Sequence, residues 1–325
     1  MSTQKRRSRY KRDPAPKGRI VLTERDYVIL AGLLRFTVLN NVHIALLTGD
    51  HNLDQLNSRL RKLWDHCIIN RLDFGDKLTF RSGSPRTVYT LGQQGAKALE
   101  ERGHKLPAGK GWNYVTEARG GVRGLFMLEH ELGANGTMIR LEQALRERPD
   151  VSELWNAEEL VARAPIATQD ARRPLSIPTT YEWNDNELYE RQTIPDGVVG
   201  FQAGRHSTML FLEYDREMVI VGKDPKRPSI LQKIASYNDI FASNTVSQRF
   251  GLAGGRVLFV TEGTDEHLAK MASACIDYRR SNRRQVNQFS FLFARYADYL
   301  EQGPLGKIWL NGDGKLTSLL KPLPS

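Results

Sequence analysis

Hydrophobic residues near the N-terminus recur with the period of a helix. One stripe, at intervals of three and four, consists of Tyr27, Leu30, Ala31 and Leu34. This spacing predicts an amphipathic helix over residues 24–36, and Thr23 directly before it is a suitable N-cap. A second, short helix is predicted over residues 41–47, because Gly49 follows it at the position where glycine commonly ends a helix.

A third helix is predicted over residues 53–66, and the period changes after it. Its core stripe consists of Leu53, Leu56, Leu60, Leu63 and Cys67. The next two segments, 67–74 and 86–92, have the character of strands and are separated by a polar, glycine-bearing turn. A closing helix is predicted over residues 93–102. Three helices and a β-hairpin in this order predict a winged helix-turn-helix, whose third helix enters the major groove of DNA.

The second half of the chain mixes strand and helix patterns. A long helix is predicted over residues 125–148, interrupted by Gly133 and Gly136, whereas 149–192 is predicted as loops with a short strand. The later pattern predicts, in order, a hairpin ending at Asp215, a helix within 227–241, a buried strand over 255–263, a helix over 265–281 and a terminal hairpin over 307–316. This order favours an α/β core with a mixed sheet.

Three acidic residues stand at the ends of strands in this half. The apolar run 209–212 leads into Glu213 and Asp215, which the alternation of a strand turns to the same face. Asp196 stands at the start of the preceding hairpin strand. Buried carboxylates need compensation, and a divalent cation with oxygen ligands supplies it. The pattern therefore predicts a metal site at Asp196, Glu213 and Asp215, or else a hairpin whose acids are solvated.

Lys233 is the basic residue best placed to join these acids. The apolar stripe of its helix consists of Ile230, Ile234, Tyr237 and Phe241. Lys233 lies at the edge of this stripe, roughly 60° from its centre at 100° per residue. From that position its ammonium group is expected to reach a neighbouring carboxylate.

The excess of positive charge predicts that the protein binds a polyanion. The formal net charge is +10, and residues 1–19 hold eight basic side chains against the single acid Asp13, which predicts a disordered basic arm that contacts phosphates. The residues expected to bind double-stranded DNA are Asn57, Arg59, Arg61, Lys62, Arg71, Lys77, Arg81 and Arg86. Among them Asn57, Arg59 and Lys62 are candidates for reading base edges, although winged helices also serve as docking modules.

The remaining composition favours a cytoplasmic protein. There is no apolar run long enough for a membrane helix and no apolar segment typical of a secretory signal. Cys67 and Cys275 lie far apart within helix-like patterns, so we interpret them as core residues in a reducing compartment. We divide the chain into a basic arm (1–19), a winged helix (20–102), a linker (103–124) and an α/β domain (125–325).

Several segments together resemble the replication-relaxation family of bacterial plasmids and other mobile elements. They are LTERDYVILAGLLRF, LNSRLRKLWDHCIINRL, VYTLGQQGAKAL, LEHELGANGTMIRLEQAL, IPDGVVGF, FLEYDRE, the pair Lys233 and Tyr237, and RVLFVTEG. The resemblance covers about residues 20–270. It implies that the second half is similar to the PD-(D/E)XK, or restriction-endonuclease-like, nuclease fold.

This resemblance implies metal-assisted phosphodiester hydrolysis. Asp196 and Glu213, with Asp215, would hold Mg²⁺, and Lys233 would orient water or stabilise developing charge. The chain departs from the nuclease pattern at one position, because Asp215 stands where that pattern has its lysine. Catalysis therefore depends on Lys233 reaching the acids from the next helix.

Three functions remain open at the level of sequence. The first is a Mg²⁺-dependent endonuclease or nickase of a mobile element. The second is a replication or transfer accessory factor, or a transcriptional regulator, with a degenerate nuclease fold. The third is a protein-docking adaptor, which would bind DNA weakly and with little dependence on salt. A homodimer on a palindromic site is compatible with the winged helix.

Overall fold

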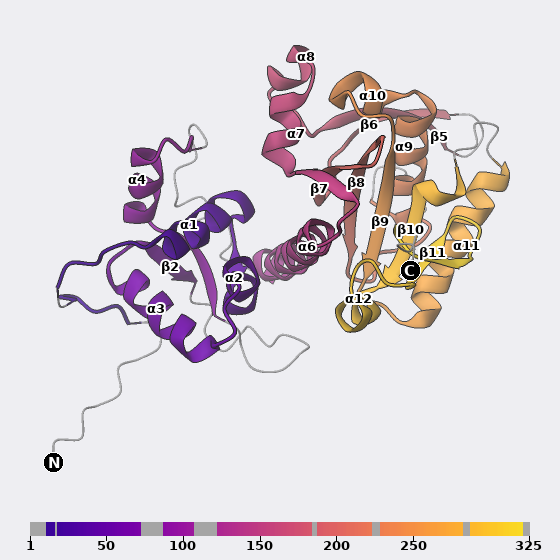
Figure 1. Cartoon of the computed structure of the whole chain (residues 1–325). Helices are drawn as coiled ribbons and strands as arrows, with labels where there is room; N and C mark the ends of the chain where they lie inside the picture. The colour runs from indigo at the N-terminus through magenta and orange to yellow at the C-terminus, as the bar shows by residue number, and fades with distance from the viewer. Residues whose placement is uncertain are drawn as a thin grey trace. The chain divides into compact units, whose positions relative to one another are not determined.

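The computed structural model describes residues 11–16, 18–72, 87–106, 122–183, 187–222, 228–281 and 287–320. The chain divides into two compact units, Met1–Ile139 and Arg140–Ser325. The division falls within helix α6 (Val122–Arg146) (Figure 1). The sequence placed a linker at 103–124, of which 107–121 lie outside the described residues.

The first unit contains the helices and the hairpin that the sequence predicted. Its described elements are α1 (Glu24–Phe36), β1 (Leu39–Asn40), α2 (Asn41–Thr48), α3 (Leu53–Asp65), β2 (Ile69–Leu72), β3 (Val88–Leu91) and α4 (Gln93–Glu101). Thr23 caps α1 through a capping box with Asp26, and Gly49 ends α2 with a left-handed φ of 69°. The strands pair in the order β1-β3-β2, all antiparallel.

The core of this unit follows the predicted stripe of α3, with two exceptions. Leu56, Leu60 and Leu63 are fully buried. Leu53 is 42% exposed, because it begins the helix directly after the exposed cap residue Asn52. Cys67 lies beyond the end of α3, is half-buried and has a positive φ of 60°. The expectation that both belong to the core stripe is therefore wrong.

A mixed sheet organises the second unit and confirms the predicted α/β class. Its strands, in chain order, are β4 (Val151–Trp155), β7 (Gly197–Ala203), β8 (His206–Asp215), β9 (Gly255–Thr261), β10 (Phe291–Arg295), β11 (Trp309–Asn311) and β12 (Leu316–Thr317). The spatial order of these described strands is β12-β11-β10-β9-β8-β7-β4. Strands β8, β9 and β10 are parallel, and every other neighbouring pair is antiparallel.

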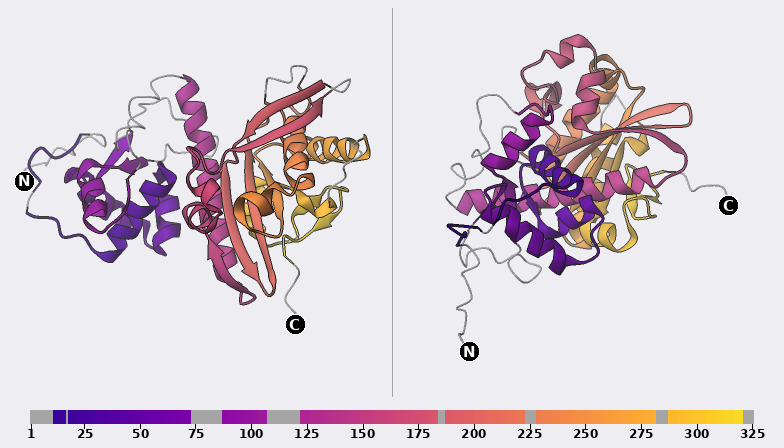
Figure 2. Two further views of the ribbon diagram at one scale, coloured as in Figure 1. Left: turned by 90° about the horizontal axis from the view of Figure 1, so that it is seen from above. Right: turned by 60° about the vertical axis from the view of Figure 1, so that its left-hand side comes forward.

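Helices pack against both faces of this sheet. The connections between the parallel strands contain α9 (Ile230–Ala242), α10 (Thr245–Phe250) and α11 (Asp265–Ser281). Helices α9 and α11 contact each other beside the sheet (Figure 2). They share one hydrophobic core with Phe211 of β8. On the other face, Tyr296 at the start of α12 (Tyr296–Gln302) meets the ring of Tyr214 edge-on, with centroids 5.5 Å apart. Side chains of β8 thus alternate between two buried layers.

Two expectations about this region are wrong. Residues 149–192 were expected to form loops with a short strand, but they contain β4, α7 (Ala157–Arg163), α8 (Ile166–Gln169), β5 (Ile177–Trp183) and β6 (Glu187–Thr193). Helix α6 also runs unbroken through its glycines. A Cβ atom at Gly136 would lie 2.6 Å from the ring of His43, so this glycine serves close packing and does not interrupt the helix.

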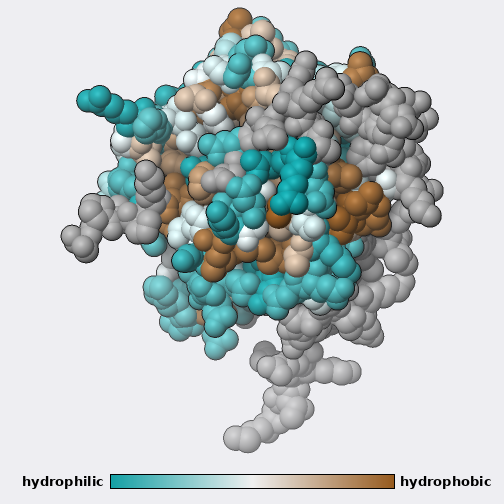
Figure 3. All heavy atoms as spheres, turned by 90° about the vertical axis from the view of Figure 1, so that its right-hand side faces the viewer, coloured by the Kyte–Doolittle hydropathy of each residue, from teal (hydrophilic) through white to brown (hydrophobic). Residues whose placement is uncertain are grey.

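Hydrophilic and hydrophobic side chains are mixed on the surface. Figure 3 shows hydrophilic areas interspersed with hydrophobic ones on one face of the molecule. Among the described residues, no helix is both long and apolar enough to cross a membrane.

Candidate functional site

Antiparallel pairing of β7 and β8 brings Asp196 beside Glu213. The register pairs Gly197 with Leu212, and the backbone N–H of Asp196 donates to the Leu212 carbonyl at 2.9 Å. The Asp196 Oδ2 atom in turn accepts a hydrogen bond of 2.8 Å from the backbone N–H of Tyr214. The start of one strand and the end of the next thus hold two carboxylates at one end of the sheet.

Helix α9 places a lysine and a tyrosine on Glu213. The Glu213 side chain is 2% exposed; its Oε2 atom binds the Nζ of Lys233, and its Oε1 accepts a 2.5 Å hydrogen bond from the Tyr237 hydroxyl. Lys233 and Tyr237 are four residues apart, so they lie on one face of the helix. The Lys233 Nζ also lies 4.0 Å from Asp196 Oδ2. The ammonium group therefore bridges the two carboxylates, as the position of Lys233 predicted.

The pKa values of these groups reflect burial and mutual charge. Burial raises the pKa of Glu213, the charge of Asp196 raises it further, and the ammonium of Lys233 opposes both. Burial works against the charged form of Lys233, but the charges of Glu213 and Asp196 outweigh it and raise the pKa of Lys233. Lys233 therefore stays protonated at neutral pH and supplies a fixed positive charge.

Asp215 shares the face of Glu213, as strand alternation predicts, but its carboxylate has different partners. Its Oδ1 accepts from the backbone N–H of Met218 at 2.7 Å. Its Oδ2 accepts from the Thr261 hydroxyl at 2.6 Å and lies 2.8 Å from the Nε2 of His267 on α11. The backbone N–H of Glu217 adds a further bond of 3.2 Å. These contacts tie the end of β8 to β9 and α11.

The chemistry of the donors fits Mg²⁺ at Asp196 and Glu213 better than at all three acids. In the described part of the chain, no three or more His, Cys, Asp or Glu side chains are grouped to hold a metal ion. Mg²⁺ is commonly bound through one or two carboxylates, with water and substrate phosphate as the other ligands. Asp196 and Glu213 provide such a pair beside the Lys233 ammonium group, with one partner on each oxygen of Glu213, whereas the oxygens of Asp215 have four polar partners.

Arg59, a predicted DNA contact, forms an ion pair inside the first unit. Its guanidinium group donates through Nε and Nη2 to the buried carboxylate of Asp26, and through Nη2 to the Val21 carbonyl at 2.8 Å. Burial would raise the pKa of Asp26, but hydrogen bonds from Arg59 and Thr23 outweigh it and lower this pKa. Arg59 thus fastens α3 to the first turn of α1.

Arg61 and Arg71 surround Trp64 together with Arg12. The centres of their guanidinium groups lie 4.7, 4.6 and 5.6 Å, respectively, from the indole ring. Arg12 also donates to the Ile69 carbonyl at 3.3 Å. Residues 11–16 therefore pack on the unit, and the expectation of a disordered arm is wrong for them. The three cations lie beside β2, where Arg61 also pairs with Asp65 at 3.3 Å.

The exposed face of α3 carries fewer cations than the sequence suggested. Lys62 is exposed, as are Gln55 and Ser58, and these three line a shallow depression on the helix surface. Asn57 is half-buried and accepts a hydrogen bond from Asn41 at 3.2 Å. The other predicted contacts, Lys77, Arg81 and Arg86, lie outside the described residues.

A comparison with known protein families identifies the family of this chain. One family model, described as replication-relaxation, matches residues 30–254, which is more than half of the chain. The chain belongs to the replication-relaxation family. No curated protein and no solved structure matches it.

The replication-relaxation match covers both candidate regions. It includes α3, Asp196, Glu213 and Lys233, and it ends just before β9. The family's description associates the chain with replication or relaxation of DNA, in agreement with the resemblance seen in the sequence.

Three residues at the end of the sheet had no assigned role from sequence. The role of Tyr237 could have been found from the sequence, because it follows Lys233 by one helical turn and therefore lies on the same face of the helix. No sequence pattern indicated Thr261 and His267, because they reach Asp215 only through the parallel register of β8 and β9 and the packing of α11.

Proposed function

We propose that this replication-relaxation protein binds duplex DNA of a plasmid or another mobile element and cuts one strand in a Mg²⁺-dependent reaction. The observation that carries the proposal is the Lys233 ammonium group, bound to Glu213 and 4.0 Å from Asp196. A single nick releases superhelical tension, which agrees with the family's description.

DNA binding is assigned to the first unit. Helix α3 would enter the major groove with Gln55, Ser58 and Lys62, and the arginines around Trp64 would contact phosphates. The net charge of +10 supports an electrostatic contribution to affinity. We extend the proposal to a homodimer on a palindromic site and to contact with replication or transfer proteins.

The reaction is hydrolysis of a phosphodiester bond. Asp196 and Glu213 would hold Mg²⁺, which when bound polarises the phosphate and favours ionisation of a water molecule. Lys233 would stabilise the negative charge that develops on the phosphate oxygens as the water oxygen bonds to phosphorus. The phosphorus–oxygen bond to one sugar breaks, and the departing oxygen takes up a proton. Tyr237 fixes the orientation of Glu213 through its hydroxyl group.

One observation favours a second candidate function. Both carboxylate oxygens of Glu213 bind groups of the protein itself, Lys233 and Tyr237. An ion pair of this kind also suits a non-catalytic accessory factor or transcriptional regulator that uses a degenerate nuclease fold as a binding or assembly surface.

Cleavage of supercoiled plasmid separates these two candidates. We expect open-circular product with Mg²⁺ or Mn²⁺ and none with EDTA. Asp196→Asn and Glu213→Gln should each reduce the rate at least about 100-fold, the scale on which single charge-stabilising groups act. The exposed Asp170→Asn is the matched control and should leave the rate unchanged. Nicking that survives in both site variants would contradict the proposed site, and intact plasmid with tight DNA binding would favour the accessory factor.

A salt series tests DNA binding itself. Anisotropy of a labelled duplex should report an affinity that falls steeply between about 50 and 200 mM salt, because phosphate contacts release counterions. Weak binding with a flat response to salt would instead support a protein-docking adaptor.

A further inference from the structure

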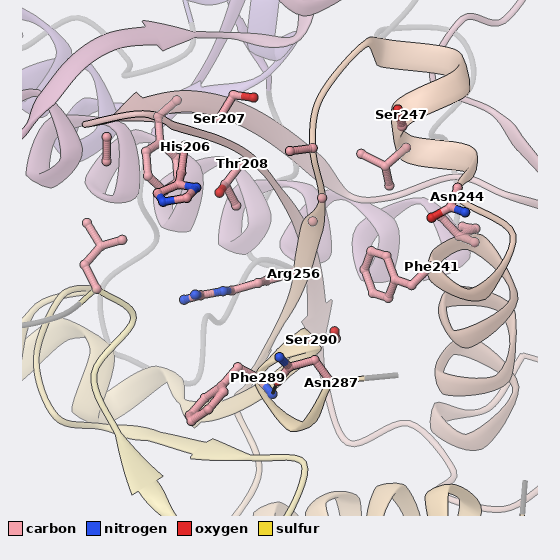
Figure 4. A pocket seen from close by; sticks show the side chains of 18 of the residues that line it. His206, Ser207, Thr208, Phe241, Asn244, Ser247, Arg256, Asn287, Phe289 and Ser290 are labelled. Carbon is pink, nitrogen blue, oxygen red and sulfur yellow. Dashed lines mark hydrogen bonds between the residues drawn. The ribbon is translucent and has the colours of Figure 1, made fainter. Parts of the chain in front are cut away.

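A cavity of about 870 Å³ opens in the second unit, at the end of the sheet opposite Glu213. Its lining includes Ser207 and Thr208 at the start of β8 and Arg256 at the start of β9, whereas Glu213 stands near the end of β8 (Figure 4). Its volume lies within the roughly 300–1,000 Å³ typical of small-molecule sites. Nothing in the proposed phosphodiester chemistry uses this cavity.

Arg256 gives the cavity its charge. Its side chain extends into the open space, with His206 and Thr208 on one side and Phe289 on the other (Figure 4). Its Nη1 donates to the Leu319 carbonyl at 2.6 Å, and no acidic side chain in the described part of the chain forms an ion pair with it. Burial lowers the pKa of Arg256, without an opposing charge to offset the loss of solvent.

A half-buried guanidinium group with one neutral acceptor among the described residues favours an anionic ligand. It carries five N–H donors in a planar fork that matches phosphate oxygens, and charge removed from water is costly unless it is paired. Asp150, the acidic residue in the lining, is itself bound by Arg148 through two hydrogen bonds of 2.7 Å. Thr208 lies two positions before Leu210, the residue that pairs with Arg256 across β8 and β9, so it shares the face of Arg256 and adds a neutral hydroxyl group there.

Aromatic rings supply the second kind of contact. Phe289 is 38% exposed at the cavity, and its backbone N–H is fixed by the side chain of Asn287 at 2.9 Å. Phe241 also lines the space, and its ring packs against Phe291 at 6.1 Å between centroids. An exposed phenylalanine that lines the same cavity as a guanidinium group suits a planar base attached to a phosphate, because bases stack on aromatic faces.

We propose that this cavity binds a nucleotide, with its phosphate group at Arg256 and its base against Phe289. The shared chemistry, an aromatic base joined to a phosphate, is found both in a free nucleotide and at the phosphorylated end of a single DNA strand. This site is separate from the acids at the other end of the sheet and does not depend on cleavage.

Calorimetry on the full chain tests the assignment with deoxyadenosine monophosphate as the probe. We expect saturable binding at sub-millimolar concentration, and binding of deoxyadenosine weaker by about tenfold or more, since the charged hydrogen bonds are lost. Arg256→Gln should weaken binding of the monophosphate by about tenfold or more, and Phe289→Ala by about fivefold or more. The exposed Arg172→Gln is the matched control and should bind as the wild type does.

Phe289→Ala keeps the test decisive if Arg256→Gln does not fold, because the Phe289 side chain is partly in solvent already. No binding by the folded wild type up to about 10 mM would overturn the proposal, as would unchanged affinity in Phe289→Ala and Arg256→Gln. Glu213→Gln should retain nucleotide affinity, which separates this site from the proposed cleavage site. Competition by a 5′-phosphorylated oligonucleotide would assign the nucleotide to a DNA end, and lack of competition would assign it to a free nucleotide.

Discussion

At the scale of single residues, Glu213 is the group on which the account rests. It is 2% exposed and would be unstable as a carboxylate without Lys233 and the Tyr237 hydroxyl. The sequence predicted that Lys233 reaches a neighbouring carboxylate, because it lies at the edge of an apolar stripe, but it gave no role to the Tyr237 hydroxyl. It did not predict the partners of Asp215, which come from elements remote in the sequence.

Removal of the Lys233 charge should destabilise the protein. In Lys233→Met the carboxylate of Glu213 loses its counter-charge, and we expect the free energy of unfolding to fall by about 3 kcal/mol. Urea denaturation measures this loss. The double variant Lys233→Met/Glu213→Gln should recover most of it, because no buried charge is left unpaired. The exposed pair of Lys270 and Glu266 provides a control, and Lys270→Met should leave the free energy of unfolding nearly unchanged. Equal losses in the two lysine variants would contradict this interpretation of Glu213.

The same residues predict a loss of stability at high pH. The pKa of Lys233 is raised above its usual 10.5, and burial with the charge of Glu213 raises the pKa of Tyr237 above 10.0. Each group keeps its proton in the folded state at a pH where the unfolded chain has lost it. The stability they contribute is therefore fully present below about pH 10 and declines as pH rises further. Unfolding measured between about pH 10 and 11.5 should show a steeper decline in wild type than in Lys233→Met; parallel curves would be inconsistent with a raised Lys233 pKa.

At the scale of elements, local signals predicted the first unit well. Caps at Thr23 and Gly49 fixed helix ends, and the stripe of α3 identified its buried face. The hairpin of β5 and β6 was missed for a physical reason. Its buried positions include Thr179, Tyr181 and Thr193, with few aliphatic residues, so the alternation that marks a strand was not visible.

Helix α3 also shows that charge alone does not separate structural cations from candidate DNA contacts. Arg59 and Lys62 are both basic, yet Arg59 is bound to the buried Asp26 and Lys62 is exposed. We expect Lys62→Ala to weaken duplex binding and to lower the slope of log affinity against log salt by about one, as for one phosphate contact. The exposed Lys97→Ala on α4 is the control and should leave the slope unchanged. Equal slopes for all three proteins would remove Lys62 from the interface.

Arg59→Ala should act on stability instead. It leaves the buried Asp26 without its cation, and we expect a loss of about 3 kcal/mol in the free energy of unfolding of the first unit. Thermal or urea unfolding would detect it. A variant that keeps wild-type stability but loses DNA affinity would restore Arg59 as a direct DNA contact.

At the scale of the whole molecule, the chain combines a first unit of helices and a small antiparallel sheet with a second, mixed α/β unit in one replication-relaxation protein. The order of these units followed from the change of hydrophobic period along the sequence. The cavity at Arg256 could not be predicted from that period. Its lining comes from β8, β9 and segments up to Leu320, which only the order of strands in the sheet brings together. The central claim is the proposed Mg²⁺-dependent cleavage of DNA by Asp196, Glu213 and Lys233 at one end of this sheet.

The most direct measurement is the conversion of supercoiled plasmid to open circle by wild type and by Glu213→Gln, each followed over a Mg²⁺ titration. The account predicts a rate that rises with Mg²⁺ in wild type and stays at the background level in Glu213→Gln, with duplex affinity equal in both. Equal rates in the two proteins, or no nicking by wild type at any Mg²⁺ concentration, would contradict it.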